Sequence, residues 1–126
     1  MKTEHKHIFS DSGEMSELAD ASVDLVITSP PYPMIEMWDT VFTGLNPRID
    51  TWLKNNDGSR CFEAMHRILD NTWQEVYRVL KPNRFACINI GDATRTLDGH
   101  FALYPNHARI INAMSDLGFT VLPCII

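Results

Sequence analysis

Hydrophobic positions along the chain fall into short continuous runs and longer spaced stretches. Residues 23–28 predict a strand that stops at the two prolines after Ser29, and its core Leu25-Val26-Ile27 is apolar without alternation, as in a strand covered on both faces. Between Ser59 and Leu80 apolar residues recur at steps of three and four, which predicts an amphipathic helix. Pro82 disfavours helical geometry at the residue before it, so we expect the helix to end there.

The second half of the chain repeats this alternation. Residues 84–90 predict a second buried strand, residues 105–117 a second helix that stops at Gly118, and residues 119–126 a third strand. Strands that alternate with helices are typical of an α/β domain with parallel strands. We therefore expect a three-layer fold in which residues 25–28, 85–90 and 120–126 are parallel neighbours. Residues 10–18 predict a turn and short helix, and residues 33–58 a helical excursion between loop signals.

The composition of the chain indicates which class of protein it belongs to. With 126 residues, 44% of them hydrophobic and 21% charged, the chain is expected to form one folded domain. It holds no apolar stretch of bilayer length and no signal peptide, so we expect a cytoplasmic protein. Cys61, Cys87 and Cys124 each lie among apolar residues and are odd in number, which favours small core residues over disulfides. The histidines have no partners at ligand spacing, so no metal site is expected.

The loop at residues 28–32, Thr-Ser-Pro-Pro-Tyr, carries the chemistry. It lies just past the carboxyl end of the first strand, where open α/β sheets place their ligand crevices. Its prolines stiffen the loop and remove two backbone donors, which leaves the carbonyl groups of Ser29 and Pro30 as fixed acceptors. Such a surface suits an exocyclic amine on a flat ring, and Tyr32 is placed to stack on that ring. The alternative is a stiff turn in which Tyr32 caps the core.

This loop, the segment that leads to it from Ser10, the helix end at residues 75–83 and the strand end at residues 89–92 resemble the DNA amino-methyltransferases. These enzymes carry a Ser/Asp/Asn-Pro-Pro-Tyr/Phe catalytic loop, which is the most specific part of the likeness. The resemblance continues through residues 107–119 and so covers nearly the whole chain. It implies a Rossmann-like fold that depends on S-adenosyl-L-methionine, in the permuted order with the catalytic half first.

The resemblance also implies a reaction. Methyl transfer would go from S-adenosyl-L-methionine to the N4 amine of a cytosine flipped out of double-stranded DNA, in a restriction-modification system. Ser at position 29 favours cytosine N4 over adenine N6, and the open alternatives are adenine, a glutamine side chain or RNA as substrate, or an inactive truncated protein. The implied catalytic residues are Ser29, Pro30, Pro31 and Tyr32, the implied cofactor-binding residues are Asp11, Thr28 and Asp92, and no metal is implied. For Asp11 a solvated turn carboxylate is an equal alternative.

Two features depart from the family pattern. Asn83 and Arg84 stand where the family has Gly-Gly, and no F-x-G-x-G loop is present to hold the methionine part of the cofactor. In permuted members that loop and the target-recognition region lie downstream. We therefore expect residues 1–126 to be the catalytic part of a methyltransferase domain, completed by a second polypeptide or a homo-oligomer. A surface that grips DNA on another segment would also account for the net charge of −5.

Overall fold

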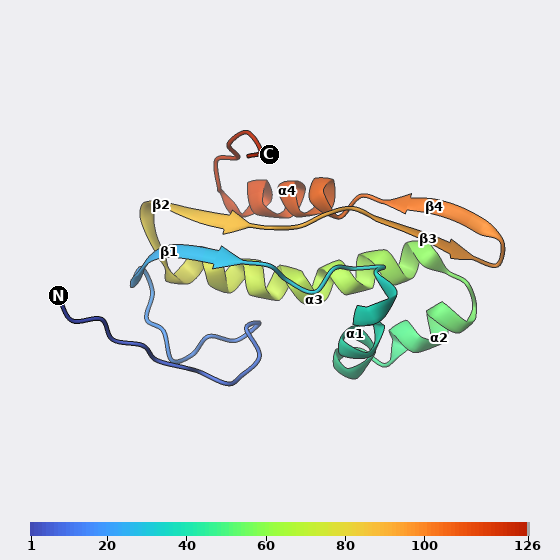
Figure 1. The fold of residues 1–126 in the computed structure, drawn as a ribbon, viewed down its shortest axis with the longest axis horizontal. Coiled ribbons are helices and arrows are strands. Elements are labelled where there is room, and N and C mark those ends of the chain that lie inside the picture. Colours follow the sequence, from blue (N-terminus) through green and yellow to red (C-terminus); the bar gives the residue numbers. More distant parts are fainter. Residues whose placement is uncertain (126) are drawn as a thin grey trace.

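The structure is a computed structural model that describes residues 1–125. A long central helix and a pair of parallel strands form its framework (Figure 1). The helix, α3, spans Gly58–Val79, and the strands β1 and β2 span Val23–Thr28 and Leu80–Ile88. The remaining elements are η1 (Glu36–Trp38), α1 (Asp39–Leu45), α2 (Arg48–Lys54), β3 (Ala93–Leu97), β4 (His100–Tyr104) and α4 (Asn106–Leu117). The α/β class and the helical excursion between β1 and α3 are confirmed.

The two parallel strands pair as the sequence predicts. Leu25 lies opposite Phe85, Ile27 opposite Cys87, and Thr28 opposite Ile88. One irregularity shifts the register near the start of β1. The carboxyl ends of both strands therefore reach the same edge of the sheet, and this edge holds the proline loop.

The amphipathic pattern of α3 builds the core. Its apolar stripe is buried against α1, α2 and α4, and its members are Cys61, Ala64, Met65, Leu69, Trp73, Val76 and Val79. The helix ends at Val79 and the chain enters β2 at Leu80, two residues before Pro82. Burial of about 1.5–3 kcal/mol per large apolar side chain makes this stripe the main source of stability.

Only one face of the parallel pair is covered within residues 1–125. Val26, Ala86 and Ile88 pack against the helix-side core, whereas on the opposite face Ile27 is 74% exposed and Phe85 60% exposed. The expectation that this sheet is covered on both faces is therefore wrong for the part of the chain that the structure describes. Both faces of β1 and β2 carry apolar side chains, but only the face toward the helices is covered. An apolar run therefore does not by itself show that both faces are buried.

The third strand is a second correction. Residues 119–125 form no strand, and Ile126 lies outside the described residues. Pro123 has no N–H to give to a ladder, and Val121 and Leu122 are exposed, so this apolar run lacks a pairing partner. The second sheet is instead the antiparallel pair β3–β4. Asp98 and Gly99 join the two strands with φ of 48° and 74°, which fits the left-handed turns that close tight hairpins.

The smaller expectations have mixed outcomes. Residues 10–18 form turns and no helix. Cys61 is buried, and burial raises the pKa of its thiol to about 11, as expected for an unreactive core residue. Cys87 and Cys124 are exposed, so for these two the core prediction is wrong. No helix among residues 1–125 is long and apolar enough to cross a bilayer.

Candidate active site

The proline loop is held at the carboxyl edge of the sheet. Beyond the ladder, the Asn89 N–H donates to the Thr28 carbonyl at 2.9 Å, which keeps the two strand ends together. In the loop Pro30 is buried and Ser29 is exposed. The stiff backbone is therefore anchored in the protein while the serine hydroxyl faces solvent.

Tyr32 lies against the strand end that follows β2. A methyl group added to Gly91 would sit 3.5 Å from Cε2 of the Tyr32 ring, in ordinary van der Waals contact. The Tyr32 hydroxyl donates to the Asn89 carbonyl at 3.5 Å, the outer limit of a hydrogen bond. The side chain is half-buried, so part of the ring is available to a flat ligand. Two segments that carry the resemblance, residues 28–32 and 89–92, thus meet at one place.

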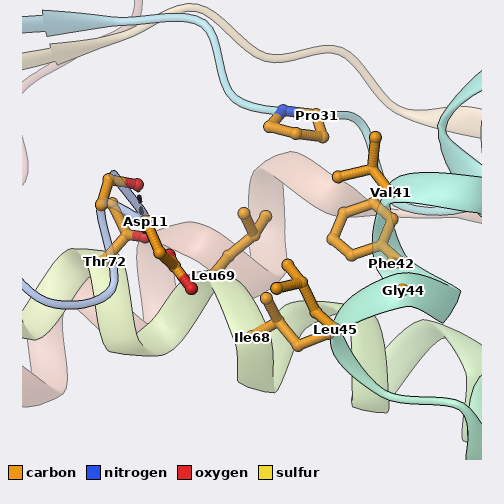
Figure 2. A pocket seen from close by; sticks show the side chains of 10 residues that line it. Asp11, Pro31, Val41, Phe42, Gly44, Leu45, Ile68, Leu69 and Thr72 are labelled. Atoms are coloured by element: carbon orange, nitrogen blue, oxygen red, sulfur yellow. Dashed lines mark hydrogen bonds between the residues drawn. The ribbon is translucent and has the colours of Figure 1, made fainter. Parts of the chain in front are cut away.

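A cavity of about 450 Å³ lies on the α3 side of the loop. Figure 2 shows Pro31 over this cavity, Asp11 and Thr72 at one end and the side chains of α1 at the other. Its size falls within the range of about 300–1,000 Å³ that is usual for small-molecule sites. The residues that line it are Asp11, Ser12, Pro31, Val41, Phe42, Gly44, Leu45, Ile68, Leu69 and Thr72.

The turn that carries Asp11 is fastened to α3 from several sides. The Gly13 N–H donates to Asp11 Oδ1 at 2.8 Å, and the hydroxyls of Ser12 and Thr72 are 3.1 Å apart. Further along, the guanidinium of Arg78 donates to the carbonyls of Leu18 and Met15, each at 2.9 Å. A carboxylate held in this way at the rim of an apolar cavity can accept hydrogen bonds from ligand hydroxyl groups.

The other two cofactor candidates lie elsewhere. Thr28 sits in the ladder opposite Ile88, and neither Thr28 nor Asp92 lines the cavity. Asp92 Oδ1 accepts a hydrogen bond from the N–H of His107 at 3.0 Å, in the first turn of α4. This contact gives Asp92 a capping role at the start of a helix, where carboxylates are favourable. A cofactor role for Thr28 or Asp92 stays a prediction.

Two fully buried polar residues, which the sequence pattern does not reveal, lie next to the loop. Asn106, the first residue of α4, donates from Nδ2 to the carbonyls of Pro33 at 2.9 Å and Gly91 at 3.2 Å. Its Oδ1 lies 2.8 Å from Nε2 of His66 on α3. Burial lowers the pKa of His66 below its usual value, with the Asn106 hydrogen bond acting in the opposite direction. Spacing could not reveal this pair, because 40 residues separate its members.

Residues 1–125 hold no group of three or more His, Cys, Asp or Glu side chains arranged to bind a metal ion. What the edge of the sheet does present is a set of carbonyl acceptors, one hydroxyl and one aromatic ring beside a cavity with a carboxylate at its rim. These groups can bind a flat amine and a polar small molecule on two sides of one loop.

Comparisons with known proteins identify the family. The family described as DNA methylase, the N6/N4 methyltransferases, matches residues 23–126. The type II methyltransferase M.MthZI of Methanothermobacter thermautotrophicus is 50% identical over an alignment of 127 positions that covers 100% of this chain and 36% of that protein. The type II methyltransferase M.MjaI of Methanocaldococcus jannaschii is 47% identical over 135 residues, covering 98% of this chain and 45% of the relative. This chain therefore spans less than half the length of these curated relatives.

Solved structures show the same fold. TTHA0409 of Thermus thermophilus, assigned as a DNA modification methylase, superposes with a TM-score of 0.66 at 29% identity over 90% of this chain and 40% of that one. Its complex with S-adenosyl-L-methionine gives a TM-score of 0.66 at 31% identity, over 89% and 40% of the two chains. The fold and the site thus define an α/β protein of the methyltransferase class. The chain belongs to the DNA methylase family of N6/N4 methyltransferases, and the resemblance found in the sequence is confirmed.

Proposed function

We propose that this chain provides the catalytic loop of a DNA methyltransferase that modifies an exocyclic amine, with cytosine N4 as the target and S-adenosyl-L-methionine as the methyl donor. One observation carries the proposal. Pro31 faces the cavity that Asp11 borders, while Tyr32 of the same loop lies against the Gly91 strand end. A single rigid loop therefore separates a place for a small molecule from a place for a flat base.

The residues of the loop have distinct roles in this proposal. Tyr32 stacks on the flipped base, a contact worth about 1–3 kcal/mol. The Ser29 hydroxyl and the Pro30 carbonyl accept hydrogen bonds from the amine and orient its lone pair toward the methyl group. No strong general base is needed, because the surplus amine proton can pass to water after transfer. Alignment of the two reactants then provides much of the rate.

The cavity fits the adenosine part of the cofactor. Its apolar walls, which include Phe42 and Leu69, suit a flat base, and the Asp11 carboxylate suits ribose hydroxyls. When bound, S-adenosyl-L-methionine would supply an electrophilic methyl group. The contribution of the chain is to bind the adenosine and to hold the loop beside it.

We further propose that a second polypeptide, or a second copy of this chain, completes the cofactor and DNA sites. Two observations support this. The chain covers 36% and 45% of the two curated relatives, and its net charge of −5 leaves no excess of basic residues for DNA phosphates. The names of these relatives, type II methyltransferases, support a place in a restriction-modification system.

The test of the proposed function is product identity. DNA is incubated with S-adenosyl-L-methionine and the enzyme that contains this chain, digested to nucleosides and analysed by mass spectrometry. We expect N4-methylcytosine, because Ser29 occupies the first position of the loop. N6-methyladenine would support the alternative target with the same loop. Unmodified DNA, from enzyme that binds the cofactor, would contradict the proposal.

A further inference from the structure

The proline loop has few backbone donors of its own. Pro30, Pro31 and Pro33 have no backbone N–H, so the loop can be gripped mainly through its carbonyl groups. The next amide, the N–H of Met34, contacts only the Met65 thioether, at 3.4 Å, and sulfur is a weak acceptor. The Ile35 N–H donates to the Tyr32 carbonyl at 3.2 Å, so the Pro33 carbonyl must find its donor on another element.

Asn106 supplies that donor. Its amide nitrogen donates to the carbonyl of Pro33, at the end of the loop, and to the carbonyl of Gly91, beside the Tyr32 ring. One planar amide group thus binds both segments that border the proposed base site, the end of the proline loop and the Gly91 strand end. Its bonds of 2.9 Å and 3.2 Å fix how far apart those segments stand.

His66 determines which way the Asn106 amide points. Because both amide hydrogens go to carbonyls, Oδ1 of Asn106 must accept, and Nε2 of His66 at 2.8 Å is its donor. This requires His66 to carry its single proton on Nε2. Its Nδ1 is buried and has no hydrogen-bond partner among the described residues, as expected for the unprotonated nitrogen of a neutral ring. A rotated Asn106 amide would set its oxygen against two carbonyl oxygens, so the pair has one satisfactory arrangement.

We propose that Asn106, oriented by His66, is a positioning residue that sets the separation between the Ser29–Tyr32 loop and the Gly91 strand end, and so the width of the base site. The use of that width for a base rests on the proposed function. The positioning of the loop stands on the hydrogen bonds alone and can be tested without activity.

The first experiment uses nuclear magnetic resonance on the full 126-residue chain labelled with ¹⁵N. Long-range ¹H–¹⁵N correlations are expected to show His66 protonated on Nε2. Asn106→Asp keeps the size and an acceptor but removes both donors. We expect it to move the amide signals of Tyr32 and Gly91, because the carbonyls of Pro33 and Gly91 lose their shared donor.

Two further variants separate positioning from general destabilisation. Asn112→Asp makes the same chemical change at an exposed position of the same helix, and it should leave the Tyr32 and Gly91 signals in place. His66→Gln keeps a nitrogen donor near Asn106 and should preserve them, whereas His66→Leu should not. Equal responses of these signals to Asn106→Asp and Asn112→Asp would overturn the proposal. If Asn106→Asp does not fold, protonation of wild-type His66 on Nδ1, or loss of the signals in His66→Gln, overturns it.

The second experiment measures methyl transfer by the enzyme that contains this chain. Asn106→Asp should lower kcat by about a hundredfold, because a misplacement of about 1 Å has that effect on an aligned reaction. The KM for S-adenosyl-L-methionine should change by less than about twofold, since Asn106 does not line the Asp11 cavity. A raised KM with unchanged kcat would contradict the role in the base site. An enzyme with the expected spectra and no DNA methylation would refute the proposed function and leave the positioning of the loop supported.

Discussion

At the catalytic loop, each residue type has one physical consequence for the site. The prolines remove donors and stiffen the chain, Pro30 and Pro33 are buried as anchors, and Ser29 stays exposed. Tyr32 is half-buried, and its hydroxyl contact with the Asn89 carbonyl is long at 3.5 Å. The ring of Tyr32 should therefore matter more than its hydroxyl, and the hydroxyl of Ser29 more than its size.

Tyr32→Ala should weaken binding of a flipped base by about 1–3 kcal/mol, a loss of about ten- to a hundredfold, because a stacking ring is removed. Tyr32→Phe is the matched control and should be mild, since the ring face remains and the lost hydrogen bond is weak. Affinity for a duplex in which the target base is mismatched measures the effect, because a mismatched base flips out at lower cost. Equal losses in the two variants would show that the hydroxyl, rather than the ring, is what matters.

Ser29→Ala should lower turnover more than DNA affinity. The hydrogen bond from the amine strengthens as its nitrogen attacks, so its removal affects the transition state more than the ground state. Single-turnover methylation rates and DNA binding, measured on the same variant, separate the two effects. If both stay at the wild-type level, the Ser29 hydroxyl takes no part in the reaction.

At the scale of elements, α3 depends on a close approach at its first residue. A methyl group on Gly58 would collide with Oη of Tyr104 at the end of β4, and the Tyr104 ring is held by Phe62 at a centroid distance of 5.7 Å. Gly58→Ala should therefore destabilise the protein by about 1–3 kcal/mol through overpacking.

Gly44→Ala in α1 is the control, because an added methyl there meets nothing within 4 Å. It should be neutral or stabilise by up to about 1 kcal/mol. Urea unfolding of both variants measures the contrast, and a Gly58→Ala protein as stable as Gly44→Ala would show that Tyr104 moves aside freely.

The elements that sequence predicts well are those set by local pattern. The stripe of α3 and the stop before the prolines follow from periodicity and backbone chemistry, and both are present. The β3–β4 hairpin was missed although Asp98-Gly99 is a hairpin signal, because each strand has only five residues and β3 is largely polar. The strand at residues 119–126 failed for a different reason. A strand exists only where a neighbour pairs with it, and an apolar run does not specify that neighbour.

The residues of the candidate site likewise differ in whether a local sequence pattern can reveal them. The proline loop could be found from sequence because its chemistry lies in consecutive residues. Asp11 could be proposed only through the resemblance, and its place beside Pro31 depends on contacts of its loop with α3. The Asn106–His66 pair joins helices far apart in the chain, so no local pattern contains it.

At the scale of the whole molecule, the buried His66 couples stability to pH. Its pKa in the folded chain is lowered from 6.5 by burial, so between these two values the unfolded chain binds a proton that the folded chain does not. Full stability is therefore expected above pH 6.5, with a fall as the pH drops below it, of at most about 1.4 kcal/mol per pH unit from this group. Glu63, whose pKa is lowered by hydrogen bonds from Arg109, adds a further loss below pH 4.5. Urea unfolding between pH 5 and 7.5 measures the slope. His66→Gln should flatten it, and an unchanged slope in that variant would assign the effect to another group.

The chain offers only part of a binding site for the cofactor. The cavity offers apolar walls and Asp11 for adenosine, but the sequence holds no glycine loop for the methionine part, and the chain covers less than half of its curated relatives. The 126-residue chain alone should therefore bind S-adenosyl-L-methionine more weakly than micromolar, while a larger enzyme that contains this chain and a glycine loop should bind it tightly. Calorimetric titration of both proteins measures the difference.

In the larger enzyme, Asp11→Ala should weaken binding of S-adenosyl-L-methionine by about tenfold or more through the lost ribose contact. Glu17→Ala removes the same charge from an exposed position of the same loop and should leave the affinity unchanged. Micromolar affinity in the chain alone would mean that residues 1–126 already form a complete cofactor site.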